Sequence, residues 1–335
     1  MKNLSTDSLL WQKRTSHNLR RKGKKYNPNK VPFNRVLNQM MLEAPDSLDL
    51  YDPEKNQEIL DFIENIEKIA LTHKVVLDFS ITRFISAAAL LLIYAKLDAM
   101  KSSALHNLVR IKADSLKGQV KSAITKSGLK ELTLNRRLEI NPHSRTIPII
   151  KGSARGEEFE QVIDHIQLNI LKDLTPEQER VLGSAVSETI GNVKLHAYPD
   201  DSTDQKPWWI ICSIIDDSLY LAIFDLGVGI PATILSKSWV QRQISSAPNL
   251  LKLAVSKSDA DLIELSMRVG KTQTKEEKHG LGSASIKALV HETPNGSLWI
   301  FSNKGMYHKH REGFETSNFK SSIEGTLVQW NIQIR

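Results

Sequence analysis

The sequence predicts an α/β protein with two folded parts, on three observations. Its 335 residues exceed the size at which a single hydrophobic core usually stops growing. Between residues 54 and 127, short apolar runs typical of strands alternate with helical patterns. Residues 208–224 contain two further apolar runs that a short polar turn joins into a hairpin. With 40% hydrophobic and 25% charged residues, the composition is that of a globular protein.

Residues 1–45 are predicted to form a basic and flexible arm. From Trp11 to Arg35 the sequence has nine Lys or Arg residues and no acidic residue, so the rest of the chain carries 7 − 9 = −2. Such an arm could neutralise the phosphates of a nucleic acid or bind an acidic partner. Because the run lacks a helical period and interleaved aromatic residues, a solvated tail without a specific ligand is an equal alternative.

Residues 46–135 are predicted to form a small α/β domain, because strands and helices alternate along them. The next stretch, with Pro142 and Pro148, is expected to be a linker over residues 136–155. The predicted elements are a helix from Glu54 to His73, a strand from Lys74 to Phe79, an apolar helix from Ser86 to Met100, a strand from Leu108 to Lys112 and a helix from Leu116 to Ser127.

The second domain, residues 156–335, contains a helix with a polar face. Thr175, Pro176 and Gln178 form a favourable helix start, and the helix is expected to run towards Ala197. Glu188, Asn192 and His196 are each four residues apart and therefore share one face. Asn192 offers the neutral oxygen that suits Mg²⁺ on a triphosphate. Glu188, one turn earlier, could accept a proton from the group that attacks the terminal phosphoryl.

Two glycine motifs complete a candidate nucleotide site. Asp225 ends an apolar strand, where a buried carboxylate could accept a hydrogen bond from the exocyclic amine of adenine. Gly227 and Gly229 would let the backbone pass close to the base and sugar. The run Gly280-Leu281-Gly282 opens a predicted helix, Ser283 to His291, whose N-terminal amides could hold phosphate.

The roughly fifty residues between Pro231 and Gly280 are predicted to form a lid that ATP orders. Within it, Lys271 and Lys278, with Lys275 between them, could reach the terminal phosphate, although a solvated charge run is the alternative. His196 and His279 are interpreted as packing or orienting groups, because the sequence has no Cys/His spacing suited to zinc. The single cysteine, Cys212, is predicted to be a buried structural thiol.

In this order, the motifs Glu188-Thr-Ile-Gly-Asn192, Asp225-Leu-Gly-Val-Gly229 and Gly280-Leu-Gly282 resemble the GHKL ATPases. These include gyrase, heat-shock chaperones, histidine kinases and anti-sigma-factor kinases. The resemblance implies a Bergerat-type α/β sandwich that binds Mg-ATP. It also implies a role for Thr326, because these families place a threonine near the aspartate and adenine. The ending His196-Ala197-Tyr198 is most similar to the anti-sigma-factor kinases.

The first domain resembles a STAS domain, the fold of anti-sigma-factor antagonists. The likeness rests on Val75-Val-Leu-Asp-Phe-Ser80, on Phe84 to Leu90 and on Val120 to Leu129. In that family a serine in the turn before the helix is the phosphate acceptor. Here Ala87 stands at the corresponding place, so a phosphorylation switch at this turn is not expected.

The sequence predicts a Mg-ATP-binding regulator whose nucleotide state controls partner binding, with slow hydrolysis by Glu188. One alternative is a serine/threonine kinase that resembles the anti-sigma-factor kinases. Another is a binding module in which ATP is structural. The expected partner is a regulatory or STAS-containing protein, and a homodimer is also possible. Nucleic acid is a further candidate ligand for the basic arm. No signal peptide or membrane span is recognised, so a cytoplasmic location is expected.

Overall fold

The computed structural model describes residues 34–36, 39–101, 109–136, 138, 146–153, 158, 162, 164, 175–198, 206–215, 218–256, 258–269, 282–293 and 295–333. The chain divides into two units, residues 1–34 and residues 35–335. Nearly all of the basic run from Trp11 to Arg35 lies outside the described residues. Residues 35–335 form a mixed α/β unit, in agreement with the predicted fold class.

The first part of this unit contains parallel strands. After β1 (Asn34–Val36), the strands β2 (Gln39–Glu43), β4 (Lys74–Asp78) and β6 (Val109–Ile111) pair in parallel. The short strands β3 (Ser47–Leu48) and β5 (Phe84–Ile85) form a second parallel pair. Strand β2 corrects the prediction of a flexible arm up to residue 45. Its apolar residues favour a sheet position, and Leu42 is buried beside Leu77 of β4.

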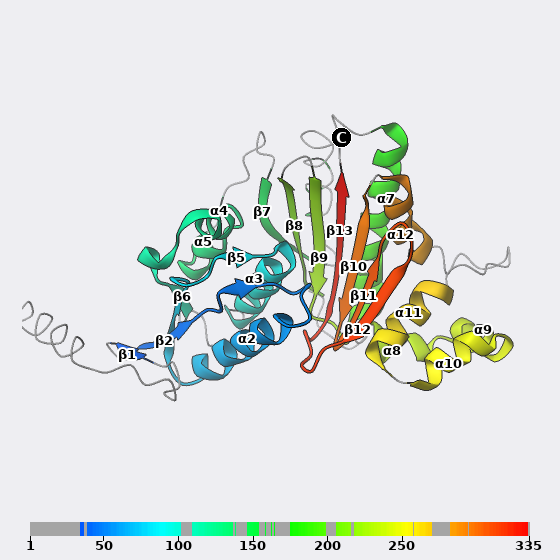
Figure 1. Ribbon diagram of the computed structural model, residues 1–335, viewed down its shortest axis with the longest axis horizontal. Helices are drawn as coiled ribbons and strands as arrows, with labels where there is room; N and C mark the ends of the chain where they lie inside the picture. Colours follow the sequence, from blue (N-terminus) through cyan, green and yellow to red (C-terminus); the bar gives the residue numbers. More distant parts are fainter. Residues whose placement is uncertain are drawn as a thin grey trace, which may run out of the picture. The chain divides into compact units, whose positions relative to one another are not determined.

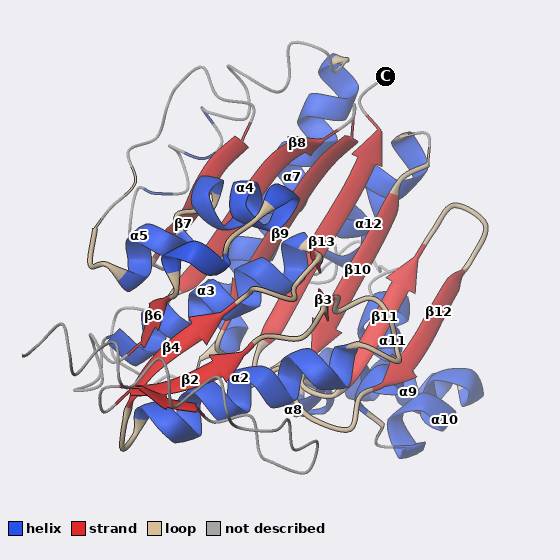
Figure 2. Ribbon diagram, turned by 60° about the vertical axis from the view of Figure 1, so that its left-hand side comes forward, coloured by secondary structure: helices blue, strands red, loops and turns tan. Residues whose placement is uncertain are grey.

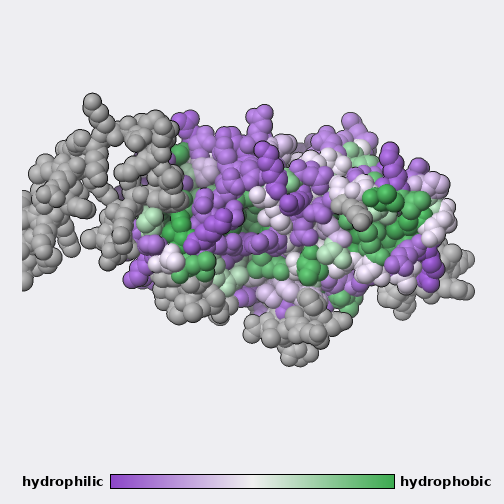
Figure 3. All heavy atoms as spheres, turned by 90° about the horizontal axis from the view of Figure 1, so that it is seen from below, coloured by the Kyte–Doolittle hydropathy of each residue, from purple (hydrophilic) through white to green (hydrophobic). Residues whose placement is uncertain are grey.

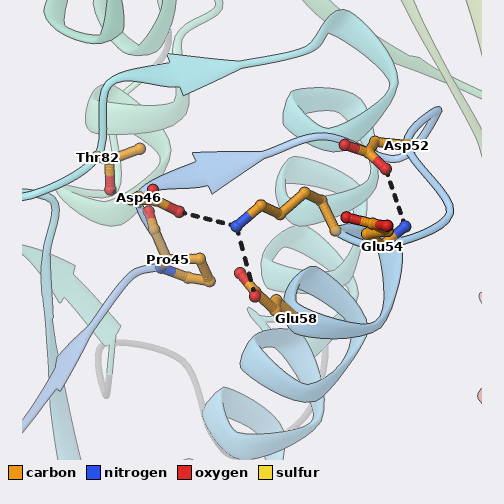
Figure 4. Close-up of polar contacts among 7 residues, drawn as sticks. Pro45, Asp46, Asp52, Glu54, Glu58 and Thr82 are labelled. Carbon is orange, nitrogen blue, oxygen red and sulfur yellow. Dashed lines mark hydrogen bonds and ion pairs between the residues drawn. The ribbon is translucent and has the colours of Figure 1, made fainter.

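Helix α2 (Asn56–Ala70) begins two residues after the predicted start at Glu54. The cause is a turn made by Asp52, whose Oδ1 accepts the Glu54 N–H at 2.8 Å while its carbonyl accepts the Asn56 N–H. Figure 4 shows Asp52 beside Glu54 at this start, and Asp46 facing Glu58. The Lys55 ammonium lies between these two acids, 3.4 Å from Asp46 Oδ1 and 3.6 Å from Glu58 Oε1.

Helix α3 (Ala87–Lys101) is apolar around most of its circumference, which is typical of a helix that is buried on several sides. It packs on α2 and on two strands of the second part, β8 (Trp208–Ile215) and β9 (Ser218–Asp225). Two polar contacts fix this packing. Trp209 Nε1 donates to Asp98 Oδ2 at 3.1 Å, and the Lys96 ammonium pairs with Glu67 and Glu324. The two predicted domains therefore share one interior.

The second part is built on a seven-stranded antiparallel sheet in the order β12-β11-β10-β13-β9-β8-β7. Besides β8 and β9, its strands are β7 (Thr146–Gly152), β10 (Ser297–Ser302), β11 (Gly305–Lys309), β12 (Phe314–Asn318) and β13 (Thr326–Gln333). Strand β7 falls within the predicted linker 136–155. The prolines suggested a boundary, but Pro148 lies at a register shift between β7 and β8, where an irregular ladder accommodates it.

Both faces of this sheet are covered. Alternate residues of its strands, such as Trp208 and Ile210, point towards α7 (Pro176–Asn192) and α12 (Gly282–Glu292). The residues between them, such as Trp209 and Phe224, are fully buried on the opposite face, where α3 packs. Figures 1 and 2 show α3 and α7 on opposite sides of the sheet. Cys212 is buried on the α7 side, which confirms the prediction of a structural thiol.

Three shorter elements complete the first part of the unit. They are the 3₁₀ turn η1 (Ala113–Ser115), α4 (Gly118–Lys126) and α5 (Leu129–Thr133). Of the helices within the described ranges, none combines the length and the apolar character that a bilayer span requires.

The residues predicted to be a lid are largely folded. They form α8 (Ile230–Thr233), the 3₁₀ turn η4 (Ile234–Ser236), α9 (Ser238–Ser246), α10 (Pro248–Ser256) and α11 (Asp259–Val269). From Ile230 to Val269 the segment predicted to be a lid is therefore mostly helical, and its ordering by ATP stays a prediction. Apolar side chains at helical spacing, including Val240, Ile244 and Leu265, build a small core of their own. Residues 270–281 lie outside the described residues.

Candidate functional site

Asp225 is the centre of the candidate site. It is the last residue of β9, its side chain is buried, and its Oδ1 accepts the Gly227 N–H at 2.8 Å. Burial raises the pKa of this carboxyl to about 7, and hydrogen bonds from the backbone N–H groups of Gly227 and Thr326 only partly oppose that shift. Within the described part of the chain, no cation pairs with it. Asp225 is thus a buried acceptor held mainly by backbone donors.

The loop after Asp225 is pressed against the end of the α7 region. The Val228 N–H donates to the carbonyl oxygen of Ala197 at 2.7 Å. A Cβ added to Gly227 would lie 2.3 Å from that same oxygen, so only glycine fits this approach. Gly227 was predicted to make room for the base and sugar of a nucleotide, but in the structure the neighbouring Ala197 requires a glycine here. The structure thereby brings the end of the helical segment that follows the first motif against the second motif.

Gly229 has a comparable constraint on the other side of the loop. Its φ is +85°, and an added Cβ would lie 2.6 Å from the Asn303 side chain. Asn303 holds the loop, because its Nδ2 donates to the Val228 carbonyl at 3.0 Å. Asn303 itself has a φ of +51° in the turn between β10 and β11, a conformation that asparagine tolerates better than most residues.

Thr326 lies beside Asp225, and its expected role near adenine stays a prediction. It is the direct partner of Asp225 in the pairing of β13 with β9. Its Oγ1 lies 2.9 Å from the Ser302 hydroxyl, which also accepts the Ile230 N–H at 2.9 Å. The preceding Gly325 has a φ of +137°, and a Cβ there would lie 1.9 Å from the Asp225 carbonyl oxygen. This close approach allows β13 to begin directly beside Asp225.

Glu188 and Asn192 lie on α7, which begins at Pro176 as predicted. Both side chains are half-buried, whereas Ile190 and Val193 are buried in the main core. After Asn192 the chain changes to a five-residue π-helix, η3 (Val193–Ala197), which ends at the contact with Gly227. His196 is exposed, and its Nδ1 lies 3.0 Å from Lys237 Nζ.

The third motif is described only in part. Gly282 is the first residue of α12, so the motif opens a helix as predicted. This helix packs beside α7, since Ile286 and Leu289 share the main core with Val186. Gly280, Leu281, Lys271 and Lys278 lie outside the described residues, as do Lys275 and His279.

The sequence did not predict the hydrogen bonds by which three residues, Tyr198, Ser302 and Asn303, fix the loop after Asp225. Tyr198 donates to the Pro207 carbonyl at 2.6 Å and accepts the Leu226 N–H at 3.0 Å. Burial, and then the charge of Asp225, raise the pKa of this phenol. Ser302 and Asn303 fix the loop from the other side. The signal for the latter pair was the Asn-Lys-Gly turn between two apolar runs, which predicts a hairpin.

The STAS-like turn lies away from this site. Ser86 is buried, its Oγ accepts the Ala89 N–H at 3.3 Å, and Ala87 is the first residue of α3. Since α3 packs on the sheet face opposite α7, the sheet separates this turn from Glu188. At the carboxyl end of β4, Asp78 is buried and pairs with Lys112 at 2.9 Å. Hydrogen bonds from Lys112 and Ser80 outweigh burial and lower the pKa of Asp78.

A search against models of known protein families finds no match to this chain, and a search of curated proteins also finds none. Among the described residues, no group of three or more His, Cys, Asp or Glu side chains is arranged to hold a metal ion. A Mg²⁺ ion that is bound through one amide oxygen and phosphate oxygens does not require such a group.

Proposed function

We propose that residues 146–333 bind Mg-ATP in the manner of a GHKL ATPase, and that the protein is an ATP-dependent regulator of a protein partner. The observation that supports this most directly is the contact of Ala197 with Gly227 and Val228. It joins the helix that bears Glu188 and Asn192 to the loop that follows the buried Asp225.

The Asp225 site fits adenine because its buried carboxylate is an acceptor for the exocyclic amine of the base. A buried carboxylate without a cation is costly, and a neutral donor that hydrogen-bonds to it lowers that cost. The exocyclic amine of adenine is such a donor, whereas guanine presents an oxygen acceptor at the same ring position. Thr326, paired with Asp225 in the sheet, would contribute a hydroxyl beside the base. The predicted ligand is therefore an adenine nucleotide rather than a guanine nucleotide.

Asn192 and Glu188 would act on the phosphate side of the nucleotide. The Asn192 amide oxygen is a suitable ligand for Mg²⁺, which would neutralise charge on the phosphates. The Glu188 carboxylate, half-buried one turn earlier, would accept the proton from an attacking water. The amides at the start of α12, from Gly282 onwards, would donate to phosphate oxygens.

Hydrolysis with partner regulation is favoured over kinase activity by the place of the STAS-like part. Ser86 is buried and Ala87 has no hydroxyl, so this turn offers no acceptor. The part as a whole covers the far face of the sheet and shares its core. It would therefore serve as a structural layer, and Ser86 and Ala87 of its turn would not accept a phosphoryl group.

Calorimetry with ATP and GTP tests this proposal. The wild-type protein should bind ATP in a Mg²⁺-dependent way and should bind GTP at least about tenfold more weakly, a difference of about 1.4 kcal/mol. Asp225→Asn should reduce ATP affinity by a similar factor or more. Asp78→Asn is the matched control, because Asp78 is another strand-end aspartate with the same 5% exposure. Equal affinities for ATP and GTP, or equal losses in both variants, would contradict the proposal.

A further inference from the structure

Helices α9, α10 and α11 form a small helical group beside the main core. Their shared interior contains Val240, Ile244 and Leu265, and Leu250 and Leu253 of α10 pack against it. This interior uses one side of α10 only. The opposite side of the helix is left without a covering element among the described residues.

The outward side of α10 carries apolar residues. Leu251 is 49% exposed and Val255 is 67% exposed, and their spacing of four residues places them on one face. Figure 3 shows apolar side chains gathered into a patch over α8, α9 and α10. A patch of this kind, with polar residues around it, is typical of an interaction surface. We call the outward side of α10, with Leu251 and Val255, the α10 face.

Helices α9 and α10 carry charge of one sign. From Leu226 to Ser258 the sequence contains no Asp or Glu, although the Asp261 carboxylate of α11 accepts a hydrogen bond from the Ser256 hydroxyl at the end of α10. The same stretch contains the basic residues Lys237, Arg242 and Lys252 within the described ranges, and Lys252 is exposed on α10 next to Leu251. A partner that buries Leu251 would therefore meet the Lys252 ammonium, and Asp261 lies only at the Val255 end of the face.

We propose that the α10 face docks an acidic amphipathic helix of another protein. Apolar anchors one turn apart match the i, i+3, i+4 anchors of such a helix, and acidic residues at its edges would lie near Lys252. The basic run from Trp11 to Arg35 is a poor occupant, because it carries the same sign of charge. A second copy using the same face would also bring like charges together. The exposed apolar area is modest, so the complex is expected to be weak and reversible.

This docking surface does not depend on nucleotide binding. The α10 face is defined by α9, α10 and α11, and neither Leu251 nor Val255 belongs to the candidate nucleotide site. Failure of the ATP proposal would leave the docking proposal standing, and the reverse also holds.

Fluorescence anisotropy with a labelled synthetic peptide tests the inference on the full chain. The probe is a helical peptide with Leu at i, i+3, i+4 and i+7 and Glu on its remaining faces. It should bind saturably, more weakly at high salt. Val255→Asp should weaken binding at least about tenfold, and Lys252→Glu should weaken it and reduce the salt dependence. Leu71→Asp is the matched control, since Leu71 is also 67% exposed, and it should bind as wild type does.

Several results would overturn the docking proposal. These are the absence of saturable binding, equal binding by Val255→Asp and wild type, or equal binding of a peptide with Lys in place of Glu. Binding to vesicles of anionic phospholipid that Val255→Asp abolishes, without peptide binding, would assign the face to a membrane surface instead. A concentration-dependent dimer that Val255→Asp disrupts, again without peptide binding, would assign it to a second copy. A thermal unfolding measurement on each variant serves as the control that the variant is folded.

Discussion

At the scale of single residues, the buried carboxylate of Asp225 is a source of instability, and in the proposed function it would also confer specificity for adenine. Its burial raises its pKa to about 7, while Asp78, also at a strand end, has its pKa lowered. Two things differ: the Asp225 carboxyl is the more deeply buried and has backbone N–H partners, whereas Asp78 has the Lys112 ammonium and Ser80. A carboxylate kept without a cation is more costly to the free protein, and it leaves an acceptor for a ligand.

The pH dependence of stability should reveal this cost. In the unfolded chain the Asp225 carboxyl titrates near the ordinary aspartate pKa of 3.8, and in the folded protein its pKa is about 7. Between these values the folded state retains the proton, so the free energy of unfolding falls as pH rises. The shift of about three pKa units corresponds to roughly 4 kcal/mol at most. Urea unfolding at pH 5 and pH 8 measures this effect. The free energy of unfolding should fall between these pH values in wild type, and it should fall much less in Asp225→Asn. An identical pH dependence in both proteins would contradict the assigned cause.

The glycines of the site and of α7 should respond in opposite ways to alanine. Gly227→Ala would place a Cβ 2.3 Å from the Ala197 oxygen, so the loop must move and both stability and ATP affinity should fall. The loss of stability should be on the order of 1–3 kcal/mol. Gly183→Ala is the control, because it lies in α7 with no atom within 4 Å of the added Cβ. It should stabilise the protein by about 0.5–1 kcal/mol. Chemical unfolding and calorimetry measure both effects, and equal effects at the two positions would refute the close approach.

At the scale of elements, α7 and η3 connect the proposed chemistry to the base site. After Asn192 the α-helix changes to a π-helix that ends at Ala197, the residue that meets Gly227, and Glu188 and Asn192 lie half-buried before this change. Tyr198 then closes the connection through its hydrogen bonds to Leu226 and Pro207. Functional sites are frequent places for such π segments.

Replacement of Glu188 should separate binding from turnover. Glu188→Ala removes the proposed base but neither Asn192 nor Asp225, so Mg-ATP should still bind while phosphate release slows by about 10²-fold or more. Glu177→Ala is the control in the same helix, because Glu177 is exposed and pairs with Arg180. It should leave both quantities unchanged. The measurements are calorimetric affinity and steady-state release of inorganic phosphate. Unchanged turnover in Glu188→Ala would leave ATP as a structural ligand.

At the scale of the whole unit of residues 35–335, α3 joins what the sequence predicted as two domains. Its apolar surface faces α2 on one side and strands β8 and β9 on another. Lys96, buried within this contact, pairs with Glu67 of α2 and with Glu324, which directly precedes Gly325 beside Asp225. The first part of the unit, which carries α2 and α3, therefore contacts the chain next to the candidate site from behind the sheet.

The shared interior predicts that the second part cannot fold by itself. A chain of residues 146–335 would expose Trp209, Phe224 and Phe301, all fully buried in the complete unit. It should aggregate or bind a hydrophobic dye, and it should lack a cooperative thermal transition. A chain of residues 35–335 is the control, because it keeps the whole second unit, and it should unfold in one transition. A stable and cooperative 146–335 fragment would restore the two-domain interpretation.

Local sequence patterns determined much of the secondary structure and placed parts of the site. The strand predicted over Trp208 to Ile215 matches β8, and the start of α7 and the glycine start of α12 were also predicted correctly. These elements depend on alternation, helical spacing and capping residues, which are read within a short window. The same holds for Asp225 at a strand end, whereas Thr326 was proposed only from the family resemblance.

Only the tertiary structure decided the remaining features, because they depend on contacts between residues far apart in the sequence. The proline-containing stretch before residue 152 becomes the edge strand β7 when β8 pairs with it. The apolar α3 looks from sequence like the core of a small separate domain, yet it fills the contact with the large sheet. Likewise, Gly227 is required by Ala197 and Gly229 by Asn303, partners that no local pattern around Asp225 could identify.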